Sequence, residues 1–345
     1  MKIKVETEEK YYCMEPERLI SIAEMHNFKL VKNVVESDEY FTDIDSEYIK
    51  NRTCLRIRKS NNETMEVTFK GKSDSLLGQY CKLENNINAD INQYENYVTL
   101  FSSLGFYSYC EVIKERMVYK LSTDKYDYSI MIDKISGIGG FVEFEIMSNR
   151  EDAKRKDLYD ALHLFVNKFE SLNLKEATKP YRDIVADNVY DNLFKNKEIS
   201  EIVLNLDDEL ELLEKDFFKK YKDKILDKLG SNIKWGEYKK NKDVDSKIID
   251  LVDEYLDNMI IDNKELIVCF KLLEKIKYKK SFVTNINEVF YTHLFAKLNI
   301  DIKNIIYIQN KLYKSFKDSS NVVILNEKNI RKINSILFMV INHEN

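Results

Sequence analysis

Acidic and basic side chains recur at every second position in several short segments of the first 150 residues. In VETEEK, this spacing joins Glu6, Glu8 and Lys10. An extended strand turns alternate side chains to the same face, so two carboxylates and an ammonium would share a face here. The same spacing joins five further pairs: Arg56 with Arg58, Lys70 with Lys72, Lys82 with Glu84, Lys114 with Arg116, and Glu143 with Glu145.

These faces could bind an anion and metal ions if the strands close into a barrel. A barrel would turn the faces toward one interior, where an unpaired charge carries a large free-energy penalty. Guanidinium and ammonium groups hold phosphate through charge-assisted hydrogen bonds. Carboxylate oxygens suit Mg²⁺ or Mn²⁺. The pattern therefore predicts a site for a polyanion together with metal cations.

The elements that would position these residues follow from hydrophobic periodicity. Helical spacing occurs in residues 15–28, 91–104 and 150–172, and Pro180 opens a further short helix. Side-chain character alternates in seven segments, which we expect to be strands: 2–12, 53–60, 63–72, 78–88, 107–120, 125–136 and 139–148. The sequence thus predicts an α+β domain over residues 1–186, with many antiparallel strands and flanking helices.

From about residue 187 the pattern becomes helical. Apolar residues recur at three- and four-residue spacing in 199–229, 246–259, 264–279, 285–298 and 328–342. Helices this short are marginal alone, so they must pack on one another or on the first domain. We expect residues 187–345 to form an all-α bundle.

Composition excludes several classes of function. A formal net charge of −5 does not favour nucleic-acid binding. The five cysteines include no CxxC pair, so neither a zinc site nor a disulfide scaffold is indicated. No apolar run resembles a membrane helix or a signal peptide, and we expect a cytoplasmic protein with no membrane contact. Arginine is concentrated before residue 187, so a phosphate site belongs in the first domain.

The ordered motifs ExExK, LRIR, TFK, KxR and FVEFE resemble the CYTH superfamily of triphosphate tunnel metalloenzymes. The resemblance covers residues 1 to about 186, where KPYRDIV looks like the closing helix of the family. It implies an eight-stranded antiparallel β tunnel that binds a triphosphate, together with two Mg²⁺ or Mn²⁺ ions. The implied triphosphate ligands are Arg56, Arg58, Lys70, Lys72, Lys82, Lys114 and Arg116. The implied metal ligands are Glu6, Glu8, Asp133, Glu143 and Glu145, and the implied catalytic residues are Lys10, Glu84 and Arg116.

Two reactions and one binding function agree with this resemblance. The favoured reaction is metal-dependent hydrolysis of inorganic triphosphate, ATP or a small organic triphosphate such as thiamine triphosphate, with a metal-activated water. The alternative is a class IV adenylate cyclase, which makes cyclic AMP and pyrophosphate from ATP. The third is a nucleotide- or polyphosphate-sensing module whose helical domain binds a partner or a second copy of the chain.

Overall fold

The computed structural model describes residues 6–71, 84–148, 155–195, 198–230, 233–238, 245–259, 264–283, 286, 288–298, 305–308, 321–326 and 329–344. The chain divides into two compact units, Met1–Asn188 and Val189–Asn345. The expected domain boundary lay between residues 186 and 187. Each unit has a β-sheet of its own.

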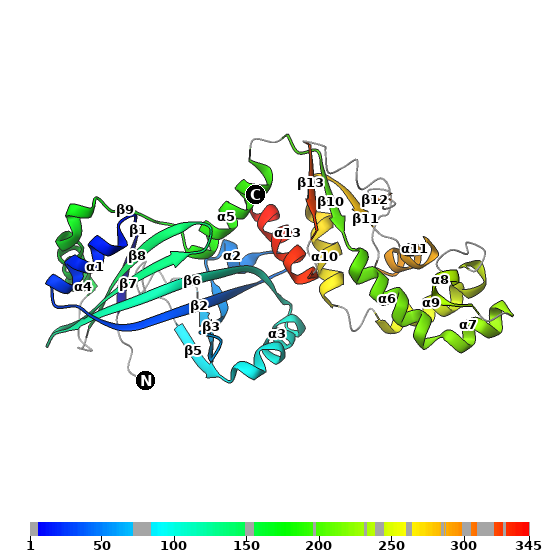
Figure 1. Ribbon diagram of the computed structural model, residues 1–345, viewed down its shortest axis with the longest axis horizontal. Coiled ribbons are helices and arrows are strands. Elements are labelled where there is room, and N and C mark those ends of the chain that lie inside the picture. The colour runs from blue at the N-terminus through cyan, green and yellow to red at the C-terminus, as the bar shows by residue number, and fades with distance from the viewer. Residues whose placement is uncertain are drawn as a thin grey trace. The chain divides into compact units, whose positions relative to one another are not determined.

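The sheet of the first unit is antiparallel, with the strand order β5-β4-β3-β2-β6-β7-β8-β1-β9 (Figure 1). The expected antiparallel sheet of eight strands is confirmed, and the two-residue β9 extends it. The strands are β1 Glu6–Tyr12, β2 Lys29–Asp43, β3 Cys54–Ser60, β4 Thr64–Lys70, β5 Glu84–Ala89, β6 Phe106–Ser122, β7 Tyr126–Ile135, β8 Gly139–Ser148 and β9 Lys175–Glu176.

Strand β2 was absent from the seven segments that alternation predicted. It has 15 residues and pairs with the 17-residue β6 along almost its whole length. The pairing register shifts between Leu30 and Lys32 and again between Tyr40 and Phe41. Between these shifts residues 32–40 keep the period of two, but both alternating faces of this stretch carry polar residues, so no hydrophobic alternation marks the strand.

Helices cover two regions of the outer face of this sheet (Figure 1). The helices α1 Pro16–Met25 and α4 Arg155–Val166 and the 3₁₀ helix η2 Asn167–Leu172 contribute to a core with β1, β7 and β8, in which Phe144 and Phe165 are buried. Helix α3 Tyr94–Ser103 packs Phe101 on Phe41 and Ile57 of β2 and β3. Each such buried side chain contributes about 1.5–3 kcal/mol.

Local signals explain where these helices begin. Pro16 occupies the first turn of α1, where its missing N–H costs no hydrogen bond. Asp43 accepts hydrogen bonds from the backbone N–H groups of Asp45, Glu47 and Tyr48, and so holds the start of α2 Glu47–Lys50. Asp90 caps the short 3₁₀ helix η1 Ile91–Gln93, which leads into α3.

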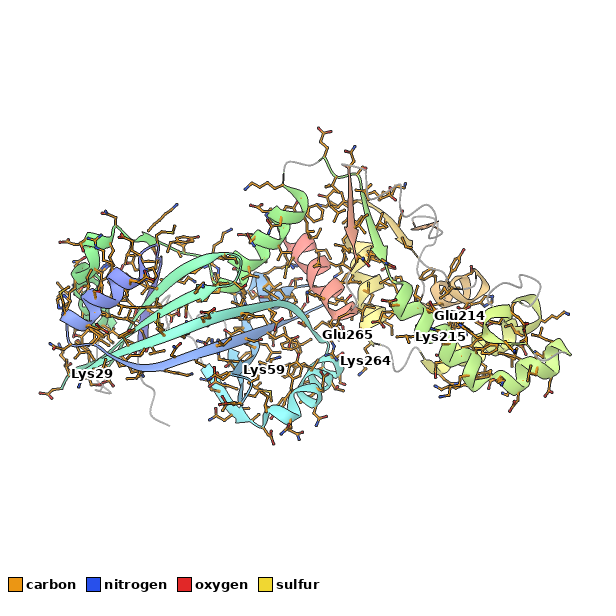
Figure 2. The ribbon with its side chains drawn as sticks, viewed as in Figure 1. Lys29, Lys59, Glu214, Lys215, Lys264 and Glu265 are labelled. Atoms are coloured by element: carbon orange, nitrogen blue, oxygen red, sulfur yellow. The ribbon has the colours of Figure 1, made fainter. Side chains whose placement is uncertain are left out.

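The apolar outer face leaves the charged residues to the inner face. Phe144 lies between Glu143 and Glu145 in the sequence of β8, and its side chain is fully buried in the outer core. Lys59, labelled in Figure 2, follows Arg58 on the outer side and has its Nζ 4.3 Å from the centre of the Tyr94 ring. Because alternate side chains of a strand face opposite ways, outer packing fixes the direction of the charges.

The second unit contains a parallel sheet with the strand order β12-β11-β10-β13. Its strands are β10 Glu201–Asn205, β11 Lys279–Val283, β12 Ile305–Ile308 and β13 Val322–Leu325. Its helices are α6 Asp207–Lys220, α7 Lys222–Leu229, α8 Trp235–Tyr238, α9 Asp245–Met259, α10 Lys264–Lys275, α11 Glu288–Lys297 and α13 Ile330–Glu344. Helix α5 Tyr181–Phe194 crosses the boundary between the units.

The parallel sheet corrects the expectation that this part of the chain is entirely helical. Helices predominate, but β10 occupies the start of the segment 199–229, whose spacing had suggested helix, and β11 begins at Lys279, where the segment 264–279 ends. Strands of a parallel sheet are covered on both faces and appear as short apolar runs without alternation. A run of four or five such residues cannot be distinguished from a buried helical turn by its period.

Among the residues with described structure, no helix is long and apolar enough to cross a membrane.

Candidate functional site

The strand register brings the predicted charged residues to one face of the first sheet. Glu8 lies opposite Glu145 and Lys10 lies opposite Glu143 in the β1–β8 pair. Directly opposed residues of an antiparallel pair share a face. The register continues this face across the sheet: Arg116 opposes Asp133, Ser129 opposes Glu145, Glu36 opposes Lys114, Asp38 opposes Arg58, Arg56 opposes Thr68, and Lys70 opposes Glu84.

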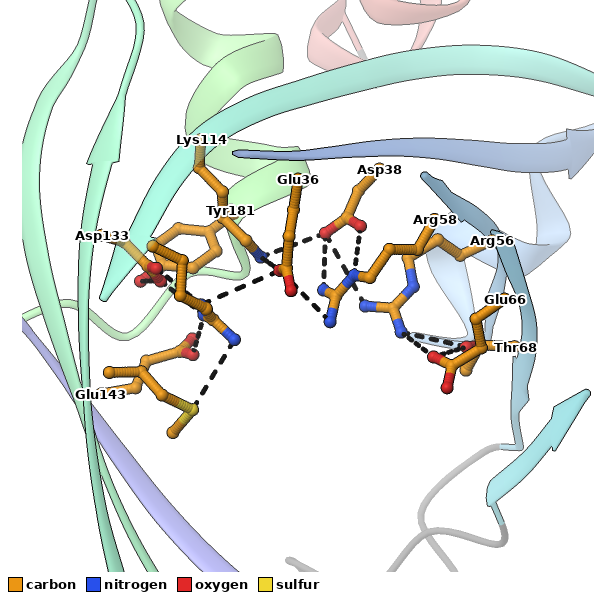
Figure 3. Close-up of polar contacts among 12 residues, drawn as sticks. Glu36, Asp38, Arg56, Arg58, Glu66, Thr68, Lys114, Asp133, Glu143 and Tyr181 are labelled. Carbon is orange, nitrogen blue, oxygen red and sulfur yellow. Dashed lines mark hydrogen bonds and ion pairs between the residues drawn. The ribbon is translucent and has the colours of Figure 1, made fainter. Parts of the chain in front are cut away.

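Asp38 is a centre of this face and is fully buried (Figure 3). The Arg58 guanidinium donates to both of its oxygens, at 2.5 Å from Nε and 2.7 Å from Nη2. Lys114 Nζ donates to Asp38 Oδ2 at 3.1 Å, and Arg56 Nη1 lies 3.7 Å from the same oxygen. Burial alone would raise the pKa of Asp38, but Lys114 and Arg58 outweigh it and hold that pKa far below its usual range.

Glu36 lies on the same strand two residues earlier and is 2% exposed. Its Oε2 atom is 3.4 Å from Arg58 Nη1, 3.4 Å from Lys114 Nζ and 3.9 Å from Arg116 Nε. Burial would raise the pKa of Glu36, yet these three cations together lower it. Three cationic groups from β3 and β6 therefore surround one carboxylate oxygen.

Arg116 is held by a second pair of acids. Its Nε and Nη2 atoms donate to the two oxygens of Asp133 at 2.6 and 2.5 Å, and Nη2 also donates to Glu143 at 2.6 Å. Burial would lower the pKa of Arg116, but Glu143 and Asp133 raise it well above its ordinary value. Arg116 is thus charged at any physiological pH and its guanidinium plane is fixed.

Tyr181, at the start of α5, reaches this cluster from outside the sheet. Its hydroxyl donates to Asp133 Oδ2 at 2.8 Å. The Nζ atoms of Lys10 and Lys114 lie 4.4 and 5.4 Å from the centre of its ring, within the range of a cation–π contact. Burial lowers the pKa of Lys10, although Glu143 and Glu8 act in the opposite direction.

Arg56 marks the far side of the cluster. Its Nη2 donates to Thr68 Oγ1 at 3.0 Å and lies 3.5 Å from Glu66 Oε1. Its Nε atom is buried and has no hydrogen-bond partner among the residues that the structure describes. Arg56 therefore has an unused donor inside the charged face.

The acids on β1 and β8 fit a divalent cation. Burial raises the pKa of Glu145, and the neighbouring charge of Glu8 raises it further. Two carboxylates with such mutual repulsion gain stability from a cation placed between them. Within the described ranges, no three His, Cys, Asp or Glu residues surround a common point. Mg²⁺ commonly binds through one or two carboxylates and fills the rest of its shell with water and phosphate oxygens.

The structure thus brings together most of the residues that the sequence predicted. It places the side chains of Lys10, Arg56, Arg58, Lys70, Lys114, Arg116, Asp133, Glu8, Glu143 and Glu145 in β1, β3, β4, β6, β7 and β8. Asp133 and Glu143, which were expected to be metal ligands, contact Arg116 in this arrangement. Lys72 and Lys82 lie outside the described residues, and for Glu6 and Glu84 only the backbone is described.

Sequence reasoning missed three acids and one aromatic contact of the site. Glu36 and Asp38 have the same two-residue spacing as the predicted pairs, and Glu66 precedes Thr68 at that spacing. The signal was therefore present, but β2 was not predicted as a strand. Tyr181 was noticed only within the KPYRDIV motif, because its contact with Asp133 joins residues far apart in the chain.

The curved antiparallel sheet and its inner face of paired charges define the triphosphate tunnel fold. The model of the CYTH domain family matches residues 4–182, which is more than half of the chain, and the protein belongs to that family. The fold of this family binds triphosphate substrates such as ATP. A comparison with curated proteins gives no match.

Several solved structures are similar to about half of this chain. A candidate adenylate cyclase from Vibrio parahaemolyticus has 17% identity and a TM-score of 0.43, with 52% of this chain and 97% of that chain covered. A protein from Pyrococcus horikoshii has 22% identity and a TM-score of 0.41, with 52% and 99% covered. A candidate adenylyl cyclase from Hippeastrum, described as having a dominant triphosphatase activity, has 14% identity and a TM-score of 0.41, with 53% and 96% covered.

Proposed function

We propose that this protein is a metal-dependent triphosphatase that hydrolyses inorganic triphosphate or a small organic or nucleoside triphosphate. The observation that carries the proposal is the position of Arg58, Lys114 and Arg116. All three cationic groups lie within 3.9 Å of one buried oxygen, Glu36 Oε2. A buried group of three cations binds a phosphoryl group through charge-assisted hydrogen bonds better than it binds a neutral ligand.

The basic residues would bind and orient the phosphate chain. Arg58 and Arg116 are fixed in plane by two-point contacts with Asp38 and Asp133, so little side-chain entropy is lost when a ligand arrives. Phosphoryl transfer depends mainly on position and on stabilisation of negative charge. The fixed cations would position the phosphate chain and stabilise its negative charge, because they are already aligned before the reaction begins.

Lys10 and the acids Glu8, Glu143 and Glu145 lie on β1 and β8, at the side of the charged face opposite to Arg56. Lys10 opposes Glu143 in the register and would place its ammonium near the reacting phosphate. Glu8 and Glu145 would hold Mg²⁺ or Mn²⁺ through carboxylate oxygens. The bound metal would supply charge neutralisation on phosphate oxygens and a lowered pKa of a coordinated water.

Product analysis of the full-length protein tests this function. The protein is incubated with Mg²⁺ or Mn²⁺ and, separately, with inorganic triphosphate, ATP and thiamine triphosphate. We expect release of orthophosphate from at least one substrate. The variant Glu8→Gln should lower this rate by roughly two orders of magnitude, because a metal ligand contributes several kcal/mol.

Glu9→Gln is the matched control, since Glu9 is the next residue of β1 and faces the other way, where it accepts a hydrogen bond from the Tyr11 hydroxyl. Cyclic AMP and pyrophosphate from ATP would show a class IV adenylate cyclase instead. Binding of a triphosphate without turnover of any substrate would indicate a sensing module.

A further inference from the structure

Glu36 differs from the other acids of the charged face in how its partners hold it. Asp38 and Asp133 accept short hydrogen bonds from Arg58 and Arg116 at 2.5–2.7 Å. Glu36 Oε2 has contacts of 3.4, 3.4 and 3.9 Å to its three cations. None of these contacts has hydrogen-bond geometry, and Oε2 has no hydrogen-bond partner in the described part of the chain.

The cations around Glu36 keep unused capacity. Arg58 uses Nε and Nη2 for Asp38, which leaves Nη1 directed at Glu36. Lys114 has three donor hydrogens, and within the described ranges only its contact with Asp38, at 3.1 Å, is a hydrogen bond. The carboxylate of Glu36 therefore occupies the centre of the three cations without saturating them.

A phosphoryl group would satisfy these donors better than Glu36 does. It has three strong acceptor oxygens and more negative charge than a carboxylate. A carboxylate and a phosphoryl group cannot both stay there, since two anions in one buried position repel strongly. The side chain of Glu36 has another cation within reach, because Lys32 Nζ donates to its Oε1 at 3.5 Å and is half exposed.

We propose that Glu36 is a built-in competitor that occupies the position of a phosphoryl group and must be displaced before a triphosphate binds. The carboxylate keeps the three buried cations compensated in the absence of substrate. Its displacement lowers the affinity for every phosphate ligand that uses this position, orthophosphate product included. Glu36 thereby sets the affinity of the site and favours product release. This proposal rests on the proposed function only in taking a triphosphate as the ligand.

Direct binding measurements test the proposal without any turnover. Full-length protein is titrated with inorganic triphosphate by calorimetry in the presence of EDTA, so that no divalent cation supports hydrolysis. Glu36→Gln removes the competing charge and nearly keeps the shape of the side chain. We expect its Kd to fall by about tenfold or more, because a like charge next to the bound phosphate opposes binding.

Two further variants distinguish the effect of a carboxylate inside the site on Kd from the effect of the net charge of the protein. Glu36→Asp keeps the charge on a side chain one methylene shorter, so it should bind with an intermediate Kd. Glu111→Gln removes the same charge from the outer face, where Glu111 is exposed and accepts a hydrogen bond from Ser37. Its Kd should stay within about twofold of the wild type, since exposed charges are screened.

An equal or higher Kd for Glu36→Gln would overturn the proposal, and so would an equal fall in Kd for Glu111→Gln. If Glu36→Gln does not fold, Glu36→Asp provides the second test, because a Kd equal to or above that of the wild type would overturn the proposal. The two claims fail separately. If the wild type binds triphosphate but does not hydrolyse it, the proposed triphosphatase activity is wrong. The comparison of Kd between the wild type and Glu36→Gln is still valid in that case. Binding by Glu36→Gln alone, with none by the wild type, would support the competitor, and absence of binding by both would overturn it.

Discussion

The hydroxyl of Tyr181 donates a hydrogen bond to Asp133, a residue 48 positions earlier in the chain, at 2.8 Å. The same carboxylate holds Arg116 at two points. The contact thus connects the first turn of α5 to a cation of the inner face. Burial raises the pKa of Tyr181 well above its usual value, and nearby Glu143 and Asp133 raise it further, so the hydroxyl remains a donor.

Removal of this hydroxyl should cost stability and activity modestly. Tyr181→Phe keeps the ring against Lys10 and deletes one hydrogen bond to a charged group, which is worth about 1.5–3 kcal/mol. We expect a lower free energy of unfolding in urea and a lower kcat/KM. Tyr159→Phe on α4 is the control, because Tyr159 is exposed. Equal effects of the two variants would contradict a specific role for the Tyr181–Asp133 contact.

Arg58→Lys should weaken triphosphate binding although it keeps the positive charge. Lysine cannot reproduce the two-point contact with Asp38 at 2.5 and 2.7 Å. With its ammonium no longer held toward the ligand, the variant should lose one charge-assisted hydrogen bond to the phosphate, about 1.5–3 kcal/mol, which corresponds to a rise in Kd of roughly tenfold to hundredfold. Lys59→Arg is the control: it exchanges lysine for arginine at the next residue of β3, which lies on the outer side. This variant should leave Kd unchanged in the same calorimetric assay.

The two glutamates of β8 should have opposite effects on stability at neutral pH without divalent cations. The pKa of Glu145 is raised, so the folded state releases its proton at higher pH than the unfolded state does, and stability falls as pH rises through this window. Glu145→Gln should therefore raise the melting temperature.

Burial would raise the pKa of Glu143, but Arg116, Lys114 and Lys10 outweigh it and lower that pKa. The contribution of Glu143 to the stability of the folded protein is therefore present above its ordinary pKa and is lost as pH falls. Glu143→Gln should lower the melting temperature, and thermal scans of both variants with and without Mn²⁺ provide the measurement. Added Mn²⁺ should stabilise the wild type more than Glu145→Gln, since the substitution removes a ligand. Shifts of the same sign for the two variants would contradict these assignments.

Asp38 should dominate the acid sensitivity of the first unit. Its pKa lies far below its ordinary value, so its contribution to stability is complete above that value and declines as pH falls toward the folded pKa. Asp38→Asn leaves Arg58 and Lys114 with less compensation and should destabilise the protein at pH 7 by about 3–5 kcal/mol. Urea unfolding between pH 3 and 7 should show a weaker pH dependence for the variant than for the wild type.

Much of the first unit could be predicted from the sequence because a strand has a strict period of two. The alternation of Glu143, Phe144 and Glu145 by itself determines that the two acids share a face and that the ring lies on the other. The same period of two puts Glu8 on one face with Lys10, and Arg56 on one face with Arg58. In β2 both alternating faces of residues 32–40 carry polar residues, so the strand was not predicted, and Glu36 and Asp38 were missed with it.

Only the tertiary structure decided which acid meets which base. Spacing along a strand says nothing about register between strands, and it is register that sets Asp38 against Arg58 and Arg116 against Asp133. The contact of Tyr181 with Asp133 depends on how the chain returns to the sheet after α4. In the second unit, short apolar runs carry no period that separates strand from helix, so pairing alone made β10 to β13 a parallel sheet. Composition and alternation determined the kinds of charge and the faces they occupy, while long-range backbone pairing determined their partners.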